Sequence, residues 1–176
     1  MSSFAQAQSV ERNRITFSAG WMQQLFGYSF ERETAPVLGL SYGYRPLKFV
    51  EFEAGVDVSL HPRAELCTQS FCYQPGDRYI RVPFGVRFIA PLVARRVELS
   101  LGGGGMVQKY SVSNPYSPFG VVSRYNWGGY FLGGAAVAID HRRRFWVSVT
   151  PRLILANTPH TVNRFLIITG DLSFRF

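Results

Sequence analysis

Three residue types that cooperate in acyl transfer lie close together in the sequence, at Asp57, Ser59 and His61. In nucleophilic catalysis, a histidine activates the serine hydroxyl and a third group orients the histidine. The flanking residues alternate between apolar and polar types, which predicts a strand in which these three side chains share one face. They would then stand in a row about 7 Å apart instead of converging on one atom. The spacing therefore favours a histidine at the base of a loop over a catalytic site.

The other two histidines offer less chemistry. A histidine that activates a serine two residues later would need serine at position 162, where this chain has Val162 after His160. No acid lies close to His160 in sequence. His141 lies among basic residues, where we expect it to be solvated. The glycine run 102–105 lacks the lysine and the hydroxyl residue that follow a phosphate-binding loop. We therefore expect no catalytic residues and no cofactor.

Charged residues of both signs recur on the polar faces of alternating segments. If two of these segments pair around their connection, Glu51 opposes Arg87 and Asp57 opposes Arg81. An unpaired buried charge costs several kcal/mol, so we interpret the set as an ion-pair network filling an interior. A narrow, gated polar channel is the alternative. The expected members are Arg14, Glu51, Glu53, Asp57, Arg81, Arg87, Glu98, Arg152, Asp171 and Arg175.

The two cysteines, Cys67 and Cys72, flank a loop-like segment. In an oxidising compartment this spacing suits a disulfide that closes a small loop. The pair is a poor zinc site, because four-coordinate zinc needs two more ligands and no nearby histidine pair supplies them. We expect a disulfide and no metal.

The composition indicates that part of the surface faces something other than water. Charged residues make up 17% of the 176-residue chain and aromatic residues 15%, whereas a soluble domain carries about 25% charge. No run of about 18 consecutive apolar residues is present, so no transmembrane helix is predicted. Few charges combined with many short alternating segments are typical of a transmembrane β-barrel.

Alternation of period two predicts eight strands, a pattern in which each strand has one apolar and one polar face. Three connections between them are short, around 46–47, 91–96 and 140–143, and the four between are long: 22–35, 59–77, 109–126 and 155–163. Strict alternation of short and long connections predicts an all-β fold, an eight-stranded antiparallel up-and-down barrel with both termini periplasmic. The expected strands cover 13–21, 36–45, 48–58, 78–90, 97–108, 127–139, 144–154 and 164–176.

Basic residues gather at the three short turns. A basic rim there could touch anionic phospholipid headgroups, or the side chains could simply be solvated. A membrane-embedded chain makes nucleic acid an unexpected partner. The residues of this expected rim are Arg45, Lys48, Arg95, Arg96, Arg142, Arg143 and Arg144.

Aromatic residues fall near the ends of the predicted strands, as in the interfacial girdles of membrane proteins. Trp21 and Trp127 belong to the outer end; Tyr44, Phe49 and Phe145, with the terminal Phe176, belong to the inner end. Pro83 and Pro151 fall inside strands, where we expect bulges or shortened pairing. The glycines of 102–105 and 128–134 allow close backbone approach or make room for Tyr130 and Trp146 inside the barrel.

The last strand sets Leu172, Phe174 and Phe176 against polar neighbours, and the chain stops on the aromatic. This ending resembles the C-terminal signal of bacterial outer-membrane barrels, which the barrel assembly machinery reads. Together with the strand count and the loop alternation, it makes residues 13–176 resemble the small eight-stranded outer-membrane barrels of the OmpA/OmpX type. Residues 1–12 are a tail in which 4–8 look like the end of a secretory signal, cleaved after Ala7.

The resemblance implies a monomeric outer-membrane protein with a structural or surface-interaction role, a plugged lumen and four extracellular loops. Its expected partners are outer-membrane lipids, lipopolysaccharide and the assembly machinery, and not nucleic acid. One alternative is a small pore or transporter of small or apolar molecules. Another is a lipid A-modifying enzyme, an acyl hydrolase or acyltransferase. The deacylase type of these enzymes resembles a His-x-Ser pair near an acid, and Val162 stands where that serine is needed.

Overall fold

The computed structural model describes residues 12–26, 34–62, 66–67, 72–73, 76–92, 96–113, 121–158 and 161–176. Within these residues, no helix is long and apolar enough to cross a membrane. The strands are β1 (Asn13–Phe26), β2 (Thr34–Leu47), β3 (Val50–Pro62), β4 (Leu66–Cys67), β5 (Cys72–Tyr73), β6 (Gly76–Leu92), β7 (Val97–Ser113), β8 (Val121–Ala138), β9 (Phe145–Thr158) and β10 (Thr161–Arg175).

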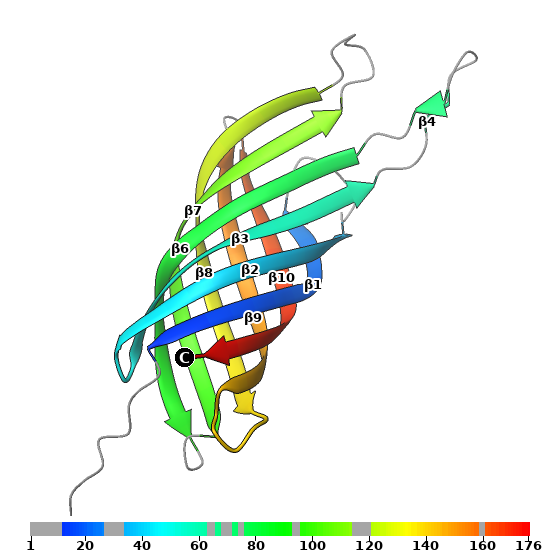
Figure 1. Ribbon diagram of the computed structural model, residues 1–176. Helices are drawn as coiled ribbons and strands as arrows, with labels where there is room; N and C mark the ends of the chain where they lie inside the picture. Colours follow the sequence, from blue (N-terminus) through cyan, green and yellow to red (C-terminus); the bar gives the residue numbers. More distant parts are fainter. Residues whose placement is uncertain are drawn as a thin grey trace, which may run out of the picture.

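Eight of the strands close into an antiparallel barrel in the order β1-β10-β9-β8-β7-β6-β3-β2 (Figure 1). The strands β4 and β5 form a separate two-stranded sheet within the β3–β6 connection. Asn13 and Phe176 exchange two backbone hydrogen bonds of 3.0 Å, which extends the pairing that closes β1 onto β10. The predicted eight-stranded up-and-down barrel is confirmed.

Strand β3 illustrates why these residues form a barrel with an inverted polarity. Its side chains alternate, so that Glu51 and Glu53 are buried inside while Phe52 and Val56 are exposed on the outer wall. Phenylalanine and valine favour the pleated conformation, and the period of two sends the charges to the opposite face. The pairing of β3 with β6 sets Glu51 opposite Arg87 and Asp57 opposite Arg81, as predicted.

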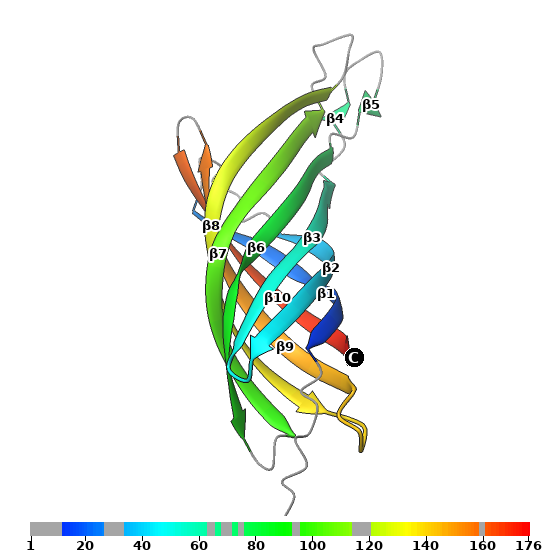
Figure 2. The ribbon, with the colours of Figure 1, turned by 60° about the vertical axis from the view of Figure 1, so that its left-hand side comes forward.

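The strands reach further than the sequence predicts at the end opposite the termini. Strand β1 continues to Phe26, β7 continues to Ser113, and β8 already begins at Val121, so 22–26, 109–113 and 121–126 are strand and not loop. In 109–113 the polar and apolar residues exchange faces relative to the rest of the strand, and 22–26 and 121–126 lack a clean alternation. Backbone pairing with neighbouring strands extends all three stretches. The longest strands are β6, β7 and β8, with 17, 17 and 18 residues. Figures 1 and 2 show β7 and β8 rising above the other barrel strands.

The two prolines interrupt backbone pairing without shifting its register. Beside Pro83, the β3–β6 pairs stop at Ala54 with Phe84 and resume in the same register at Asp57 with Arg81. Beside Pro151, the β8–β9 pairs likewise stop at Leu132 and resume at Ala135. Proline lacks the N–H group that the ladder needs, so pairing is shortened as expected. The alternative expectation, a bulge, is wrong at both sites.

Candidate functional site

The interior of the barrel is the candidate site, because the charged residues predicted from the sequence all lie on inward faces. Nine of the ten are buried, and the side chain of Arg152 is 11% exposed. They come from six strands: Arg14 from β1; Glu51, Glu53 and Asp57 from β3; Arg81 and Arg87 from β6; Glu98 from β7; Arg152 from β9; Asp171 and Arg175 from β10.

Glu53 lies at the centre of the largest cluster. Its carboxylate oxygens lie 2.5 Å from Arg87 Nη2, 3.1 Å from Arg14 Nη2 and 3.6 Å from Arg152 Nη2. Arg152 Nη1 also donates to Asp57 at 2.6 Å. The ion pairs therefore run diagonally across the lumen, although the backbone pairs Asp57 with Arg81.

A second cluster surrounds Glu98 at the end of the barrel that carries the termini. Arg175 donates to both carboxylate oxygens, at 3.0 and 2.5 Å, and Arg45 does so at 3.2 and 3.3 Å. The guanidinium of Arg175 also lies 3.9 Å from the ring centroid of Trp146. Arg14 and Arg45 join the clusters through Glu51, at 2.5 and 3.5 Å.

Arg45 corrects an expectation from the sequence. It was assigned to a basic rim because it adjoins a short turn, but the structure buries it in the lumen beside Glu98. The period of two along β2 carries the missing signal, because Arg45 shares its face with Gly43, Gly39 and the buried Val37. The face of β2 to which Arg45 belongs therefore predicts its burial better than its distance from the turn does.

Asp171 is held by hydroxyl groups instead of arginines. Thr150 Oγ1 donates to its Oδ2 at 2.5 Å and Ser148 Oγ at 3.2 Å. Nearby, Thr16 and Ser173 share a further hydroxyl–hydroxyl hydrogen bond of 2.8 Å. The lumen around Asp171 is therefore polar because of hydroxyl groups, and not because of an arginine–carboxylate pair.

The half of the lumen further from the termini is apolar, which sequence reasoning missed. Buried side chains from seven barrel strands pack there, including Met22, Val37, Tyr79, Met106, Tyr130, Ile154, Phe165 and Ile167. The signal was available in 165–168, where Phe, Leu, Ile and Ile follow one another without a polar residue. A strand segment that is apolar on both faces is buried on both faces or is solvated by lipid on one of them.

Arg81 is a fully buried cation within this apolar half. Its Nη2 donates to Ser59 Oγ at 3.0 Å and its Nε to Gln108 Oε1 at 3.3 Å. The guanidinium carbon lies 5.3 and 5.8 Å from the ring centroids of Tyr79 and Phe165, which gives cation–π contacts. Among the described residues it forms no ion pair, and its Nη1 atom has no hydrogen-bond partner.

The geometry separates two members of the acyl-transfer trio considered above. Asp57 contacts Arg152, whereas the hydroxyl of Ser59 accepts from Arg81 and lies 3.9 Å from Met22 Sδ. The side chains of His61 and His160 lie outside the described residues. Among the described side chains, no group of three His, Cys, Asp or Glu residues is arranged to hold a metal ion.

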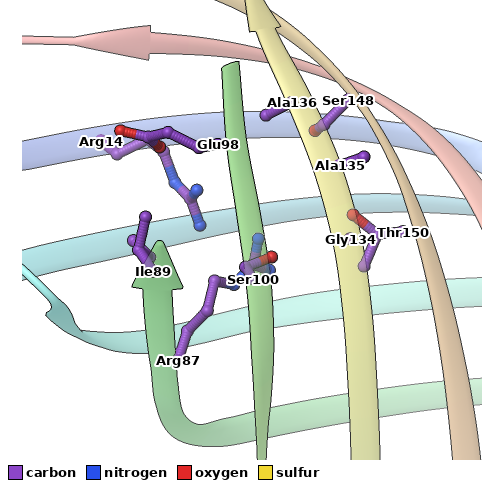
Figure 3. Close-up of a pocket in the computed structure, with 10 residues that line it drawn as sticks. All are labelled: Arg14, Arg87, Ile89, Glu98, Ser100, Gly134, Ala135, Ala136, Ser148 and Thr150. Atoms are coloured by element: carbon purple, nitrogen blue, oxygen red, sulfur yellow. The ribbon is translucent and has the colours of Figure 1, made fainter. Parts of the chain in front are cut away.

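A small cavity of about 10 Å³ lies beside the charge clusters, in the half of the lumen nearer the termini, bordered by Arg14, Arg87, Glu98, Ser100 and Thr150 among others. Figure 3 shows these side chains reaching it from several strands, next to the small residues of β8. That volume is about the minimum that a single water molecule occupies.

The outer wall carries the aromatic residues expected at interfaces. Trp21 and Trp127 are 58% and 69% exposed, and Tyr44, Phe49 and Phe145 are exposed at the end that carries the termini. Leu172 and Phe176 of the expected assembly signal are also exposed. The ring centroid of Phe174 lies 5.0 Å from that of Phe145 on the neighbouring strand β9 and 5.9 Å from that of Phe176.

The backbone of the small β4–β5 sheet brings the two cysteines face to face. Cys67 and Cys72 are register partners in this antiparallel pair. Directly opposed residues have Cα atoms about 4.5 to 5.5 Å apart, within the range that a disulfide spans. The disulfide remains a prediction that this backbone placement permits.

No family model matches the chain, and no curated protein resembles it closely enough in sequence to be matched. Its fold nevertheless matches solved structures. The neisserial surface protein A superposes with a TM-score of 0.70 and 14% identity, over 93% of this chain and 97% of that one. The attachment invasion locus protein Ail of Yersinia pestis, solved with the heparin analogue sucrose octasulfate, gives 0.61 and 16%, over 94% and 99%.

A third structure, the outer membrane protein OprG of Pseudomonas aeruginosa, has a TM-score of 0.56 and 10% identity, over 94% of this chain and 96% of that one. These proteins are small outer-membrane barrels, and the likeness covers nearly the whole of each chain. At such low identity it is the fold that they share with this chain. The chain has the fold of the small eight-stranded outer-membrane β-barrels.

Proposed function

We propose that the chain is an integral outer-membrane protein whose plugged barrel has a structural or surface-interaction role. The observation that carries this proposal is the inverted polarity of the barrel: ion-paired charges fill the inside, and large apolar side chains cover the outside. An apolar exterior of this extent would be a liability in water. In a bilayer it is solvated by lipid, and closed barrels satisfy their backbone groups internally.

The same proposal assigns an orientation and partners. The end with the termini and the short turns faces the periplasm, and the connections around 27–33, 63–75, 114–120 and 159–160 face outward. Exposed Arg124 would meet lipopolysaccharide phosphates there, as would Lys109, which lies above the Tyr125 ring at 5.7 Å. The complex of Ail with a heparin analogue is a precedent for a polyanion on this fold. The assembly machinery would read Leu172, Phe174 and Phe176, and the barrel would act as a monomer.

Reconstitution tests the plugged barrel directly. The protein refolded into micelles should migrate as a compact species on unboiled gels and as an unfolded one after boiling. Inserted into a planar bilayer, it should give no sustained ionic current, because ion pairs cross the lumen around Glu53 and Glu98 and the cavity beside them has the volume of about one water molecule. A protein that folds and inserts but conducts steadily would reject the plug and leave the membrane assignment standing.

A small pore or a transporter of small or apolar molecules is the second candidate. The interrupted ladders beside Pro83 and Pro151 favour it, because backbone pairing there is weakened on one side of β6 and one side of β9. Strands could part at these points and open the wall sideways. Uptake of an apolar dye into liposomes that contain the protein, without ionic current, would support this candidate.

We propose that the chain is not a lipid A acyl hydrolase or acyltransferase. The contacts of Ser59 with Arg81 and of Asp57 with Arg152 support this, since each side chain is held by an arginine. Mass spectrometry of lipids from liposomes that contain lipopolysaccharide and phospholipid provides the test. Acyl-chain masses should not change; a change that disappears in His61→Ala or His160→Ala would make the protein an enzyme.

A further inference from the structure

The β8–β9 turn presents consecutive arginines at the end of the barrel that carries the termini. Arg142 is exposed and Arg143 partly so, between Asp140 and the start of β9. The turn lies clearly apart from the barrel wall at the lower end in Figure 2. Exposed Arg12, Lys48 and Arg96 belong to the same rim. Among the described side chains, Asp140 is the single acid on this rim, because the other described acids lie in the lumen.

Backbone contacts hold this turn in one shape. The carboxylate of Asp140 accepts the N–H of Phe145 at 2.9 Å, and the Asp140 carbonyl accepts the N–H of Arg143 at 3.3 Å. Trp146 Nε1 donates to the Arg143 carbonyl at 2.6 Å, and the N–H of Arg175 donates to the Arg144 carbonyl at 2.8 Å. Arg143 adopts a φ of 57°, in the left-handed region.

The carboxylate of Asp140 accepts a backbone hydrogen bond within the turn and remains charged. Desolvation acts to raise the pKa of Asp140, but backbone N–H groups, led by that of Phe145, hold it below its usual value. The arginines are therefore displayed by an ordered turn, and little backbone entropy is lost when they bind an anion. Arg96 reaches the same turn, with Nη2 3.3 Å from His141 Nδ1.

The turn also lies next to exposed apolar side chains of the outer wall of the barrel. Ile139 and Phe145 flank it and are 62% and 45% exposed. Side chains of this kind anchor in the interface between hydrocarbon and headgroups, and neighbouring arginines then extend to the phosphates. The charge, the ordered backbone and the adjacent apolar belt all fit the same partner.

We infer that the β8–β9 turn, with Arg96 beside it, is a binding site for the phosphodiester group of anionic phospholipids in the periplasmic leaflet. This inference rests on the proposed insertion and orientation. Binding is stronger for phosphatidylglycerol than for zwitterionic phosphatidylcholine, and it weakens as salt screens the charges. Guanidinium groups suit this task because they donate two parallel hydrogen bonds to phosphate oxygens.

The test uses the full chain in nanodiscs with equal amounts of phosphatidylglycerol and phosphatidylcholine, and native mass spectrometry of the lipids it retains. The variant carries Arg142→Gln and Arg143→Asn, since asparagine tolerates the left-handed backbone. The matched control carries Arg78→Gln and Arg164→Gln, which removes two exposed arginines from the opposite end. Preference for phosphatidylglycerol should fall on the order of tenfold in the variant and persist in the control.

Equal lipid preference in the wild type and the variant would overturn the inference, as would an equal loss in both variants. Glycerol phosphate in solution separates a lipid site from a general anion site: competition at concentrations near those of the lipid would reject the lipid. Nanodiscs with lipopolysaccharide provide the other arm, and a preference for it lost in the same variant would reject the phospholipid. Gel mobility of the same samples reports insertion, so a failure of the barrel itself is recognised separately.

Discussion

At the scale of single residues, Glu53 is the carboxylate on which the lumen depends most. Three arginines contact it, at 2.5, 3.1 and 3.6 Å. We expect Glu53→Gln to lower the free energy of unfolding by about 3–5 kcal/mol, because it leaves buried cations without their counter-charge. Urea unfolding in micelles, followed by tryptophan fluorescence, measures this loss. Lys48→Gln is the exposed control, and a similar small effect of both changes would contradict the network.

Arg81 should behave in the opposite way, because no ion pair with another described residue offsets its burial. Arg81→Met removes a buried cation but leaves Ser59 and Gln108 without a donor. Losing those partners costs about 1–3 kcal/mol, whereas keeping an unpaired ion from water costs several kcal/mol. We expect unchanged or increased stability in the same unfolding assay. Arg87→Met, which deprives Glu53 of its closest partner, is the contrast and should be destabilising.

At the scale of elements, Gly85 of β6 makes room for Tyr130 of β8 inside the barrel. A Cβ atom at Gly85 would lie 2.6 Å from the Tyr130 hydroxyl and would also meet the Gly103 backbone, whereas one at Gly133 would lie 3.6 Å from its nearest atom. We expect Gly85→Ala to cost about 1–3 kcal/mol through overpacking. Gly133→Ala should be nearly neutral, and equal effects in the unfolding assay would contradict this packing.

The β4–β5 sheet makes a different prediction, because it lies outside the barrel wall. The register of Cys67 and Cys72 predicts a disulfide in protein taken from an oxidising compartment. Peptide mapping without reduction should recover 67 and 72 in one cross-linked fragment. Replacing both cysteines with serine should remove the cross-link while the barrel keeps its shifted mobility on unboiled gels. Free thiols in the oxidised protein would contradict the pairing.

Alternation predicted the elements wherever one face is charged and the other apolar, as in β3, and it failed where the two faces exchange character or are alike. In 109–113 the polar residues lie on the face that is apolar earlier in β7, and the sequence predicts a loop there. Apolar residues follow one another in 165–168, so the apolar half of the lumen was missed. Backbone pairing with β6 and β8, which a single segment does not encode, extends β7 through 109–113.

At the scale of the whole molecule, parity in each strand and closure of the barrel together determine which side chains enter the lumen. The sequence therefore predicted which charges lie inside, together with the opposition of Glu51 and Arg87. It did not predict the diagonal ion pairs, such as Arg152 with Asp57, because these join strands that are not neighbours. Such contacts depend on the width and tilt of the closed barrel.

At this scale, Phe176 allows the stability of the folded barrel to be tested separately from its assembly in the cell. Phe176 contributes backbone hydrogen bonds to Asn13, while its ring is half exposed on the outer wall. Phe176→Ala keeps the backbone bonds and loses the exposed ring, so refolding into micelles and the unfolding free energy should change little. If the assembly machinery reads this ring, the variant should accumulate unfolded in the periplasm of expressing cells. Fractionation and unboiled gels measure both, and normal membrane levels would show that the machinery does not depend on the terminal aromatic.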